Sequence, residues 1–300
     1  MSTLAASPPP CVAFSLRDKI KTNKPMNDAE AWPFVKNCIN AFSEREAGMK
    51  LTVLGSGTNV PDGKRNSSGY FIESPGVRMM MDCGAGTVHA LARYGLPWEH
   101  MTHMFISHFH VDHCGELASL FFAFRHGMKD KRAEPLTLIA PRGIDRVMSG
   151  LKAAFGSTLF APKFPFDVRT VSHGDRVELS PDCSLTVEKT PHTEESLAAR
   201  VDGGGRTICY TGDTDHSDEV SRFFRRASLM ISECSFRERR KGALHLSIKD
   251  AAEMAAAASV EKLLVTHFYF DVNEDELRQE LQKGFSGEVL IGRDGLTVEV

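Results

Sequence analysis

Apolar runs alternate with amphipathic stretches along most of the chain, at short intervals. The runs that predict β-strands lie at residues 51–54, 102–106, 185–190, 206–210, 229–232 and 262–265. Helical spacing of apolar residues predicts helices at residues 85–94, 114–126, 144–154, 217–226, 248–259 and 274–283. Because strands alternate with helices and no internal linker interrupts them, this pattern predicts a layered α/β sandwich.

The first 48 residues have a different pattern. Residues 1–10 are rich in Ala, Ser and Pro, and apolar residues then recur at helical spacing. This spacing predicts an amphipathic helix from Ala31 to Glu46, with Pro33 in its first turn. We therefore expect an N-terminal extension, residues 1–48, followed by one hydrolase domain, residues 49–300. The extension could cover an edge of the sandwich, shield an active site or join a partner subunit in a homodimer.

Three imidazoles and a carboxylate are packed into a short segment, His108 to His113, directly after one predicted strand. Ligands of open α/β sheets gather at the carboxyl ends of strands, where this segment is expected. An extended backbone would place His108 and His110 on one face, which leaves Asp112 and His113 for a second ion. Imidazoles with a carboxylate suit zinc, and iron or manganese is also admissible. The segment therefore predicts a metal site.

Three later strands each end in a further candidate ligand. His192 follows the strand at residues 185–190, and Asp213 and His267 follow the strands that end at residues 210 and 265. A lone His or Asp at a strand end is usually a capping or core-edge residue. Together with the first cluster, however, these residues supply more donors than one catalytic metal ion needs.

Ligands at successive strand ends give the chain a resemblance to the metallo-β-lactamase superfamily. Within it, the chain looks most like ribonuclease Z, the transfer-RNA 3′-end endonuclease, and related phosphodiesterases. The resemblance runs from about Met49 to the C-terminus and implies an αββα sandwich, in which helices flank two mixed β-sheets. It implies one metal ion on His108, His110 and His192, another on Asp112, His113 and His267, and Asp213 as the bridging ligand.

The same resemblance implies a mechanism. Two divalent ions, with Zn²⁺ expected and Mn²⁺ or Fe as alternatives, would share a water and make a bridging hydroxide available near neutral pH. That hydroxide would attack phosphorus in line, and Asp112 would hold the nucleophile and accept its proton.

Glu233 and His245 bear on which bond the site would cleave. Glu233 ends the strand at residues 229–232, and His245 precedes an Ala-rich helix. In ribonuclease Z a Glu and a His in these places form a pair beside the metals. The resemblance therefore implies that His245 is the general acid or contacts the phosphate, and that Glu233 fixes its tautomer and raises its basicity. Phosphodiester cleavage needs such an acid because the leaving alkoxide is poor, whereas lactone or β-lactam opening needs it less.

A loop after the first strand is similar to a ribonuclease Z loop in which Arg-Asn follows a proline by four and five residues. Here the proline is Pro61, and Lys64, Arg65 and Asn66 are the candidate substrate-binding residues. An ordinary Gly/Pro/Asn turn that holds two cations would have the same composition.

The chain departs from ribonuclease Z in the parts that bind transfer RNA. The segment between the predicted helix at 144–154 and the strand at 185–190 is short, and its Phe160–Phe166 stretch is not a Gly-rich arm. The net charge of −3 gives no general attraction to a polyanion. A local basic run does precede His245, at Arg237, Arg239, Arg240 and Lys241. A small phosphodiester or a short RNA is therefore the expected substrate.

Composition indicates the cellular setting. The seven cysteines are odd in number and lack paired spacing, and we recognise no signal peptide, so we expect a reducing, cytoplasmic compartment. No apolar run approaches the roughly 18–20 residues that a membrane span needs, so no membrane association is expected.

The expected function is thus that of a dinuclear metal-dependent hydrolase, a phosphodiesterase resembling ribonuclease Z. One alternative is a hydrolase of carboxylic esters, lactones or thioesters on the same metal centre. The other is a metal-holding ligand-binding or partner protein with little turnover. Glu233, His245 and the loop at residues 64–66 favour phosphate chemistry, and the complete ligand set disfavours a binding-only protein.

Overall fold

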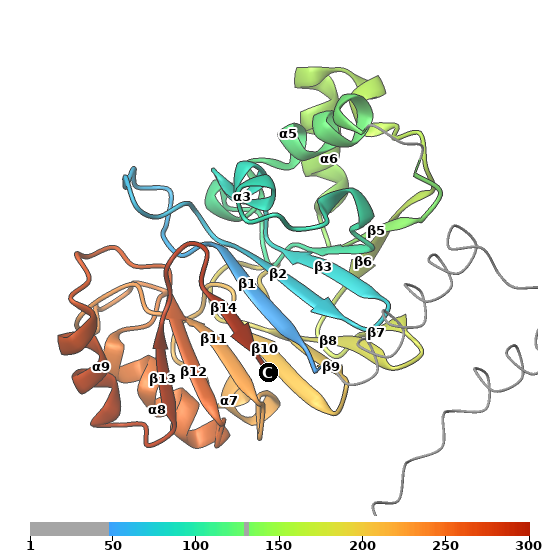
Figure 1. Cartoon of the computed structure of the whole chain (residues 1–300). Coiled ribbons are helices and arrows are strands. Elements are labelled where there is room, and N and C mark those ends of the chain that lie inside the picture. The colour runs from blue at the N-terminus through green and yellow to red at the C-terminus, as the bar shows by residue number, and fades with distance from the viewer. Residues whose placement is uncertain (1–47, 129–131) are drawn as a thin grey trace, which may run out of the picture. The chain divides into compact units, whose positions relative to one another are not determined.

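Two seven-stranded β-sheets pack face to face in the computed structural model, which describes residues 48–128 and 132–300 (Figure 1). The predicted helix Ala31–Glu46 lies outside the described residues, and the predicted boundary after residue 48 stays a prediction.

The first sheet has the strand order β14-β1-β2-β3-β4-β5-β6. Its strands are β1 (Lys50–Gly55), β2 (Gly69–Ser74), β3 (Val77–Met81), β4 (His103–Phe105), β5 (Leu136–Pro141), β6 (Phe166–Val171) and β14 (Thr297–Glu299). Strands β3 to β6 are parallel, whereas β14, β1, β2 and β3 pair in antiparallel fashion. The sheet is therefore mixed.

The second sheet has the order β13-β12-β11-β10-β9-β8-β7 and is also mixed. Its strands are β7 (Arg176–Ser180), β8 (Cys183–Lys189), β9 (Leu197–Gly203), β10 (Arg206–Tyr210), β11 (Leu229–Glu233), β12 (Lys262–Thr266) and β13 (Glu288–Ile291). Strands β10 to β13 are parallel, and β7 to β10 are antiparallel.

Helices cover the outer face of each sheet, as Figure 1 shows. Those on the first sheet include α3 (Thr87–Arg93), α5 (Leu117–Phe122) and α6 (Ile144–Phe155); those on the second are α7 (Asp218–Phe223), α8 (Ile248–Ala258) and α9 (Glu274–Gln282). Shorter turns of helix are η1 (Trp98–His100), α4 (Val111–Cys114), η2 (Ala123–Gly127) and η3 (Ser157–Phe160). The predicted αββα sandwich is confirmed.

Side-chain alternation along the strands explains the layers. In β11, Leu229 and Ile231 face the core between the two sheets, while Met230 faces the core under α7, α8 and α9. A strand that is buried on both faces reads as a continuous apolar run rather than as an alternating one. This is why the strand at residues 229–232 could be predicted from its composition.

The predicted helix at residues 114–126 is broken in the structure. It is divided into α4, α5 and the π-helical turn η2. The break lies at Glu116, whose backbone N–H donates to the carbonyl of Cys83 and whose carboxylate accepts from the N–H of Val88. These bonds to a neighbouring loop replace the helical ones, so α4 and α5 are separate helices.

The strands that carry the candidate ligands all end at one edge of the sandwich. Strands β8, β10, β11 and β12 run in one direction in the second sheet, and β1, β3 and β4 run in a common direction in the first. The N–H of His267 donates to the carbonyl of Ser56, 2.8 Å away, which joins the two sheets at this edge. Seven strand ends therefore meet where the site forms.

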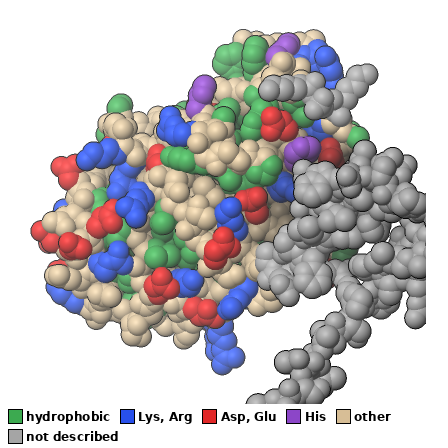
Figure 2. Space-filling view, in the orientation of Figure 1, with side chains coloured by type: hydrophobic (Ala, Val, Ile, Leu, Met, Phe, Trp, Pro, Cys, Tyr) green, Lys and Arg blue, Asp and Glu red, His purple; other side chains and the backbone are tan. Residues whose placement is uncertain are grey.

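Charge distribution, helix hydropathy and the state of the cysteines were each considered in the sequence and can be compared with the structure. On the face drawn in Figure 2, acidic and basic side chains are interspersed rather than gathered into a patch of one sign. Within the described ranges no helix is long and apolar enough to cross a membrane, and the five cysteines there are buried and unpaired. Cys114 and Cys209 are among them, and both pack in apolar clusters.

Candidate metal centre and active site

The segment after β4 bends through an extended residue into one turn of helix. His110 has ψ near 148° and caps α4, whose first turn carries Asp112 and His113. The extended backbone places His108 and His110 on the same side, as predicted, with 3.1 Å between His108 Nε2 and His110 Nδ1. The helical turn directs Asp112 and His113 to a different place, so one short motif serves two groups of ligands.

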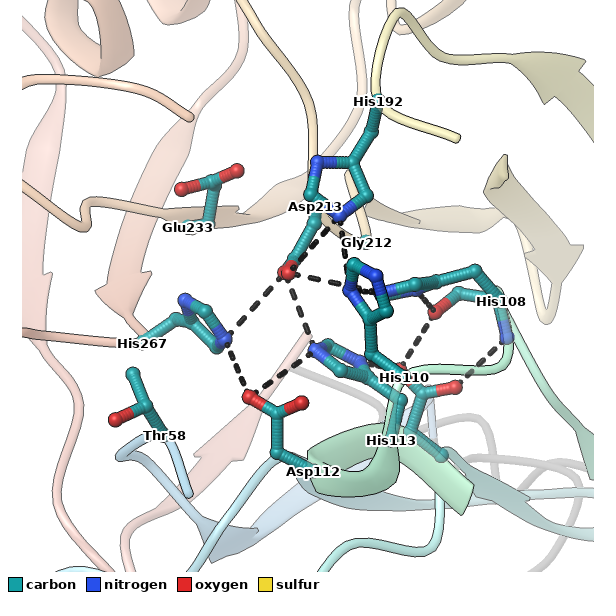
Figure 3. Close-up of polar contacts among 12 residues, drawn as sticks. Thr58, His108, His110, Asp112, His113, His192, Gly212, Asp213, Glu233 and His267 are labelled. Atoms are coloured by element: carbon teal, nitrogen blue, oxygen red, sulfur yellow. Dashed lines mark hydrogen bonds and ion pairs between the residues drawn. The ribbon is translucent and has the colours of Figure 1, made fainter. Parts of the chain in front are cut away.

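The first group consists of His108, His110, His192 and Asp213 (Figure 3). His110 Nδ1 lies 3.1 Å from His192 Nε2 as well as from His108 Nε2. Asp213 Oδ2 is 3.6 Å from His108 Nε2 and 3.7 Å from His192 Nε2. Three nitrogens and one oxygen thus converge on one point.

The second group consists of Asp112, His113 and His267. Asp112 Oδ2 is 3.3 Å from His267 Nε2 and 4.0 Å from His113 Nε2. The other oxygen of Asp213, Oδ1, lies 3.2 Å from His113 Nε2 and 3.5 Å from His267 Nε2. Each carboxylate oxygen of Asp213 faces one group, which is the arrangement of a bridging ligand.

Asp82, which sequence reasoning missed, orients His113. Its Oδ2 lies 2.6 Å from His113 Nδ1 and also accepts from the hydroxyls of Tyr210 and Ser107. Asp82 is fully buried at the end of β3 and has a φ of +56°, a conformation that Asp tolerates better than most residues. Because its carboxylate accepts a hydrogen bond from His113 Nδ1–H, the Nε2 lone pair is directed at the second group. Its position directly after an apolar run is a sequence signal, but that signal alone does not distinguish it from a capping residue.

Ser235, also missed, orients His267. Its hydroxyl donates to Glu233 Oε2 over 2.5 Å and lies 2.9 Å from His267 Nδ1. Because its single hydrogen goes to Glu233, the hydroxyl oxygen accepts a hydrogen bond from the imidazole Nδ1–H. His267 itself has a φ of +61°, which is rare for a residue with a side chain and is held here by the bond from its N–H to Ser56. Backbone and hydroxyl together aim His267 Nε2 inward. On the opposite side, His192 Nδ1 lies 2.8 Å from the carbonyl of Leu244 and donates to it.

The two groups fit divalent metal ions. Among the residues that the structure describes, His113 Nε2 and Asp213 Oδ1 are buried atoms without a hydrogen-bond partner, although they face each other. Burial lowers the pKa of both His108 and His192, which keeps these imidazoles neutral as metal binding requires. Nitrogen and carboxylate donors are the set that zinc and neighbouring metals accept. The fold and the two clusters therefore imply divalent metals.

Glu233 and His245 form the expected pair beside the candidate metal ligands. His245 Nδ1 is 3.1 Å from both carboxylate oxygens of Glu233 and 3.8 Å from Asp213 Oδ2. Helix α8 begins after Ser247, which caps it by a reciprocal capping box with Asp250, and so His245 lies in the turn before the helix. With Nδ1 on Glu233, the second ring nitrogen of His245 is left for a substrate.

Glu233 is buried and accepts several hydrogen bonds. Only 1% of it is exposed, and it accepts hydrogen bonds from the N–H groups of Thr214 and Leu246 in addition to Ser235 and His245. Burial raises the pKa of Glu233. Burial alone would lower the pKa of His245, but the hydrogen bond and charge of Glu233 outweigh it and raise that pKa. The pair therefore stabilises a proton on His245.

The loop that holds Lys64, Arg65 and Asn66 lies at the same edge. Arg65 Nη1 donates to Ser56 Oγ and to the carbonyl of Gly292, over 2.7 and 2.5 Å, and the Asn66 amide donates to the carbonyl of Leu54. Arg65 and Asn66 thus use these donors in hydrogen bonds within the protein, whereas Lys64 is exposed. Substrate binding by these three residues stays a prediction.

The segment between α6 and β8 contributes to the sandwich. It contains η3, then β6 and β7, which form the outer strands of the two sheets. These residues therefore extend the sheets and do not form a separate arm.

Comparisons with known proteins agree with this geometry. A family model described as "Anti-Pycsar protein Apyc1" matches residues 49–289. The probable metallo-hydrolase YhfI of Bacillus subtilis is 30% identical over 261 residues, which cover 84% of this chain and all of that protein. Ribonuclease Z of Haloarcula marismortui is 25% identical over 304 residues, covering 83% of this chain and 96% of that protein.

Solved structures with a similar fold include a metallo-β-lactamase fold protein and a tRNase Z. The crystal structure of the metallo-β-lactamase fold protein YhfI has a TM-score of 0.73 at 28% identity and covers 84% of this chain and all of the other. Human tRNase Z, short form, has a TM-score of 0.67 at 21% identity over 83% of this chain and 98% of the other, a likeness of fold. The chain belongs to the family of the anti-Pycsar protein Apyc1, a family of the metallo-β-lactamase fold that is related to metallo-hydrolases and to ribonuclease Z.

Proposed function

We propose that the protein is a dinuclear, zinc-dependent phosphodiesterase. The observation that carries the proposal is the position of Asp213, whose two oxygens face two separate ligand groups, with the His245–Glu233 pair beside it. Two-metal sites with a shared carboxylate are typical of enzymes that displace a group at phosphorus.

In this proposal His108, His110 and His192 hold one ion, Asp112, His113 and His267 hold the other, and Asp213 bridges them. When bound, two such ions supply charge neutralisation at the phosphoryl oxygens and a water that is activated near neutral pH. Only 6% of Asp112 is exposed. Its carboxylate would hold the nucleophile and accept its proton.

His245 donates a proton to the leaving alkoxide in this scheme. Its Nδ1–H donates to Glu233, so the doubly protonated ring gives up its Nε2 proton, and the carboxylate of Glu233 stabilises the cationic ring before that step. An ester or lactone hydrolase has less need of such an acid, because its leaving groups depart more readily. The pair therefore supports phosphodiester chemistry over the ester alternative.

The proposed substrate is a small phosphodiester or a short RNA. The relatives named ribonuclease Z support a phosphodiester bond in RNA, and the absence of an arm between α6 and β8 in the described structure disfavours a folded transfer RNA. Lys64 at the exposed tip of its loop is the proposed contact to the substrate's charge, with Arg65 and Asn66 holding the loop in place.

Ser235→Ala is expected to weaken metal binding at the second group. The substitution removes the hydroxyl that fixes the tautomer of His267 while leaving all proposed ligands in place. Loss of such an outer-shell partner typically costs roughly 10- to 100-fold in metal affinity or activity. Competition with a chromogenic chelator measures the affinity, and Ser286→Ala, on the α9–β13 connection, is the matched control. Unchanged affinity in Ser235→Ala would show that the hydroxyl does not position His267.

A substrate panel tests the proposed reaction. One metal-quantified preparation is assayed on bis(p-nitrophenyl) phosphate, a dinucleotide, a precursor transfer RNA, a lactone and a thioester. The proposal predicts turnover of bis(p-nitrophenyl) phosphate and the dinucleotide, and slow or no turnover of the precursor transfer RNA, the lactone and the thioester. Faster turnover of the lactone or thioester would assign the site to the ester class, and no turnover of any substrate with two metals bound would assign it to a binding protein.

A further inference from the structure

His267 has a backbone conformation that a residue with a side chain rarely adopts. Its φ of +61° lies in the left-handed region, and such a conformation persists only where the surrounding structure holds it. The N–H of His267 donates to the carbonyl of Ser56 over 2.8 Å. The position of the His267 imidazole therefore depends on what holds Ser56 in place.

Ser56 is held by a carboxylate from the other end of the chain. Both of its donors, the N–H and the hydroxyl, go to Asp294 Oδ1, each over 2.9 Å. Asp294 lies in the connection between β13 and β14, and Ser56 is fully buried directly after β1. A serine that gives both donors to one oxygen has little freedom to shift, so the Ser56 carbonyl is fixed relative to the C-terminal strands.

The other oxygen of Asp294 holds the loop that follows Ser56. Asp294 Oδ2 accepts from the N–H of Asn66 over 2.7 Å, and the N–H of Gly57 donates to the carbonyl of Asn66 over 2.8 Å. Arg65 Nη1 donates to Ser56 Oγ from the same side, over 2.7 Å. One carboxylate thus joins three segments that are far apart in the sequence, and Ser56 lies at their junction.

Asp294 belongs to neither proposed ligand group, and its hydrogen bonds come from Ser56 and Asn66. Burial raises the pKa of Asp294, whereas these bonds and the charge of Arg65 act in the opposite direction. Two of the three donors are backbone N–H groups, which would lose their acceptor if the carboxylate were removed. The contacts of Asp294 therefore indicate a role in holding the backbone around Ser56.

We propose that Asp294 is a positioning residue for His267. Its carboxylate fixes Ser56, and the Ser56 carbonyl holds the His267 backbone in the left-handed conformation that turns Nε2 towards the second ligand group. The inference rests on the proposed role of His267 as a metal ligand and adds a constraint to it. Ser235 orients the imidazole ring through Nδ1, whereas Asp294 sets the backbone from which the ring projects.

Hydrogen exchange of the His267 amide, followed by NMR on the full-length protein in saturating Zn²⁺, tests this chain of contacts. Without the carboxylate, Ser56 is less firmly held, so Asp294→Ala is expected to exchange the His267 amide faster, by about tenfold or more. The His113 amide, which donates to the carbonyl of His110 over 3.0 Å, is the internal reference and should keep its wild-type rate. An unchanged rate at His267 would overturn the proposal.

Metal affinity is the second measurement. Asp294→Ala keeps every proposed ligand, so competition with a chromogenic chelator is expected to show one Zn²⁺ equivalent weakened roughly tenfold and the other unchanged. For the same reason, saturating Zn²⁺ is expected to restore kcat. Equal weakening of both equivalents, or a kcat that saturating Zn²⁺ does not restore, would mean that Asp294 supports the fold in general and would contradict the proposal.

Two further variants calibrate these measurements. Asp294→Asn keeps the volume of the side chain, but its amide faces one set of donors with a donor of its own, so it is expected to fall between the wild type and Asp294→Ala. If Asp294→Ala does not fold, a wild-type exchange rate at His267 in Asp294→Asn would overturn the proposal. Asp145→Asn is the matched control, because Asp145 is an exposed carboxylate on α6.

The exchange measurement separates this inference from the proposed function. If the wild type binds no metal and turns over no phosphodiester, the proposed function fails, while the His267 amide in the same samples still decides whether Asp294 holds that backbone. If the wild type binds two ions and is active, but Asp294→Ala leaves the His267 amide and both metal affinities unchanged, the proposed function stands and the role of Asp294 is rejected.

Discussion

Replacement of Asp213 by alanine is expected to lower phosphodiester turnover by more than the roughly 10- to 100-fold that loss of an outer-shell partner costs. Its two oxygens face both ligand groups, at 3.2 Å from His113 Nε2 and 3.6 Å from His108 Nε2, so one substitution weakens both proposed metal sites. Burial raises the pKa of Asp213, but the surrounding imidazoles outweigh burial and lower it well below its usual range. The carboxylate is therefore ionised and ready to bind a cation.

The measurement for Asp213→Ala is metal content together with kcat. The variant is expected to retain less than the full complement of ions after gel filtration and to recover little activity when excess metal is added. Glu219→Ala is the control, since it removes an exposed carboxylate of α7 that pairs with Arg222 and accepts from the hydroxyl of Ser217. An Asp213→Ala protein with two firmly bound ions and normal turnover would exclude a bridging role.

His245→Ala is expected to reduce kcat in a way that depends on the leaving group. General acid catalysis contributes roughly 10²- to 10⁴-fold, and that contribution is needed most by a poor leaving group. A dinucleotide, whose leaving group is an alkoxide, should show the full loss. Bis(p-nitrophenyl) phosphate, which releases a stable phenolate, should lose far less, and the metal content of the variant should stay unchanged.

The comparison of these two substrates separates an acid from a residue that merely supports the site. His89→Ala serves as the control, because His89 is exposed on α3 and belongs to neither ligand group. A loss of equal size on both substrates would mean that His245 positions other groups instead of donating a proton. Glu233→Gln should follow the pattern of His245→Ala, since Glu233 acts through the imidazole.

The candidate ligands could be recognised in the sequence because each lies within a few residues of the end of a strand. His192, Asp213 and His267 come within a few residues of the ends of β8, β10 and β12, and strand direction brings those ends together. The structure does bring these three residues together, while their role as metal ligands, which the resemblance implied, stays a prediction. The αββα sandwich was implied by the resemblance to the metallo-β-lactamase superfamily and is confirmed.

Asp82 and Ser235 could not be found in this way. Each accepts a hydrogen bond from a residue far along the chain: Asp82 accepts from His113 and Ser235 accepts from His267. A single buried Asp or Ser has no periodicity or spacing that distinguishes an outer-shell partner from a capping residue. Such roles depend on tertiary contacts and become visible only in the structure.

The loop at residues 64–66 illustrates a different limit. Its composition suggested cations for a substrate, yet Arg65 donates to Gly292 and its guanidinium lies 4.9 Å from the ring of Phe268. Sequence identifies a charge but not its partner. The broken helix at residues 114–126 has a similar cause, because the competing bond from Glu116 to Cys83 is tertiary.

Turnover measured against metal stoichiometry tests the central claim most directly. Metal-depleted protein is titrated with Zn²⁺ and assayed on bis(p-nitrophenyl) phosphate at each step, with bound metal quantified in the same samples. The account predicts no turnover in the depleted protein, a steep rise as the second equivalent binds, and a plateau at two. Full phosphodiester turnover in the metal-depleted protein, or two bound ions without any turnover, would contradict it.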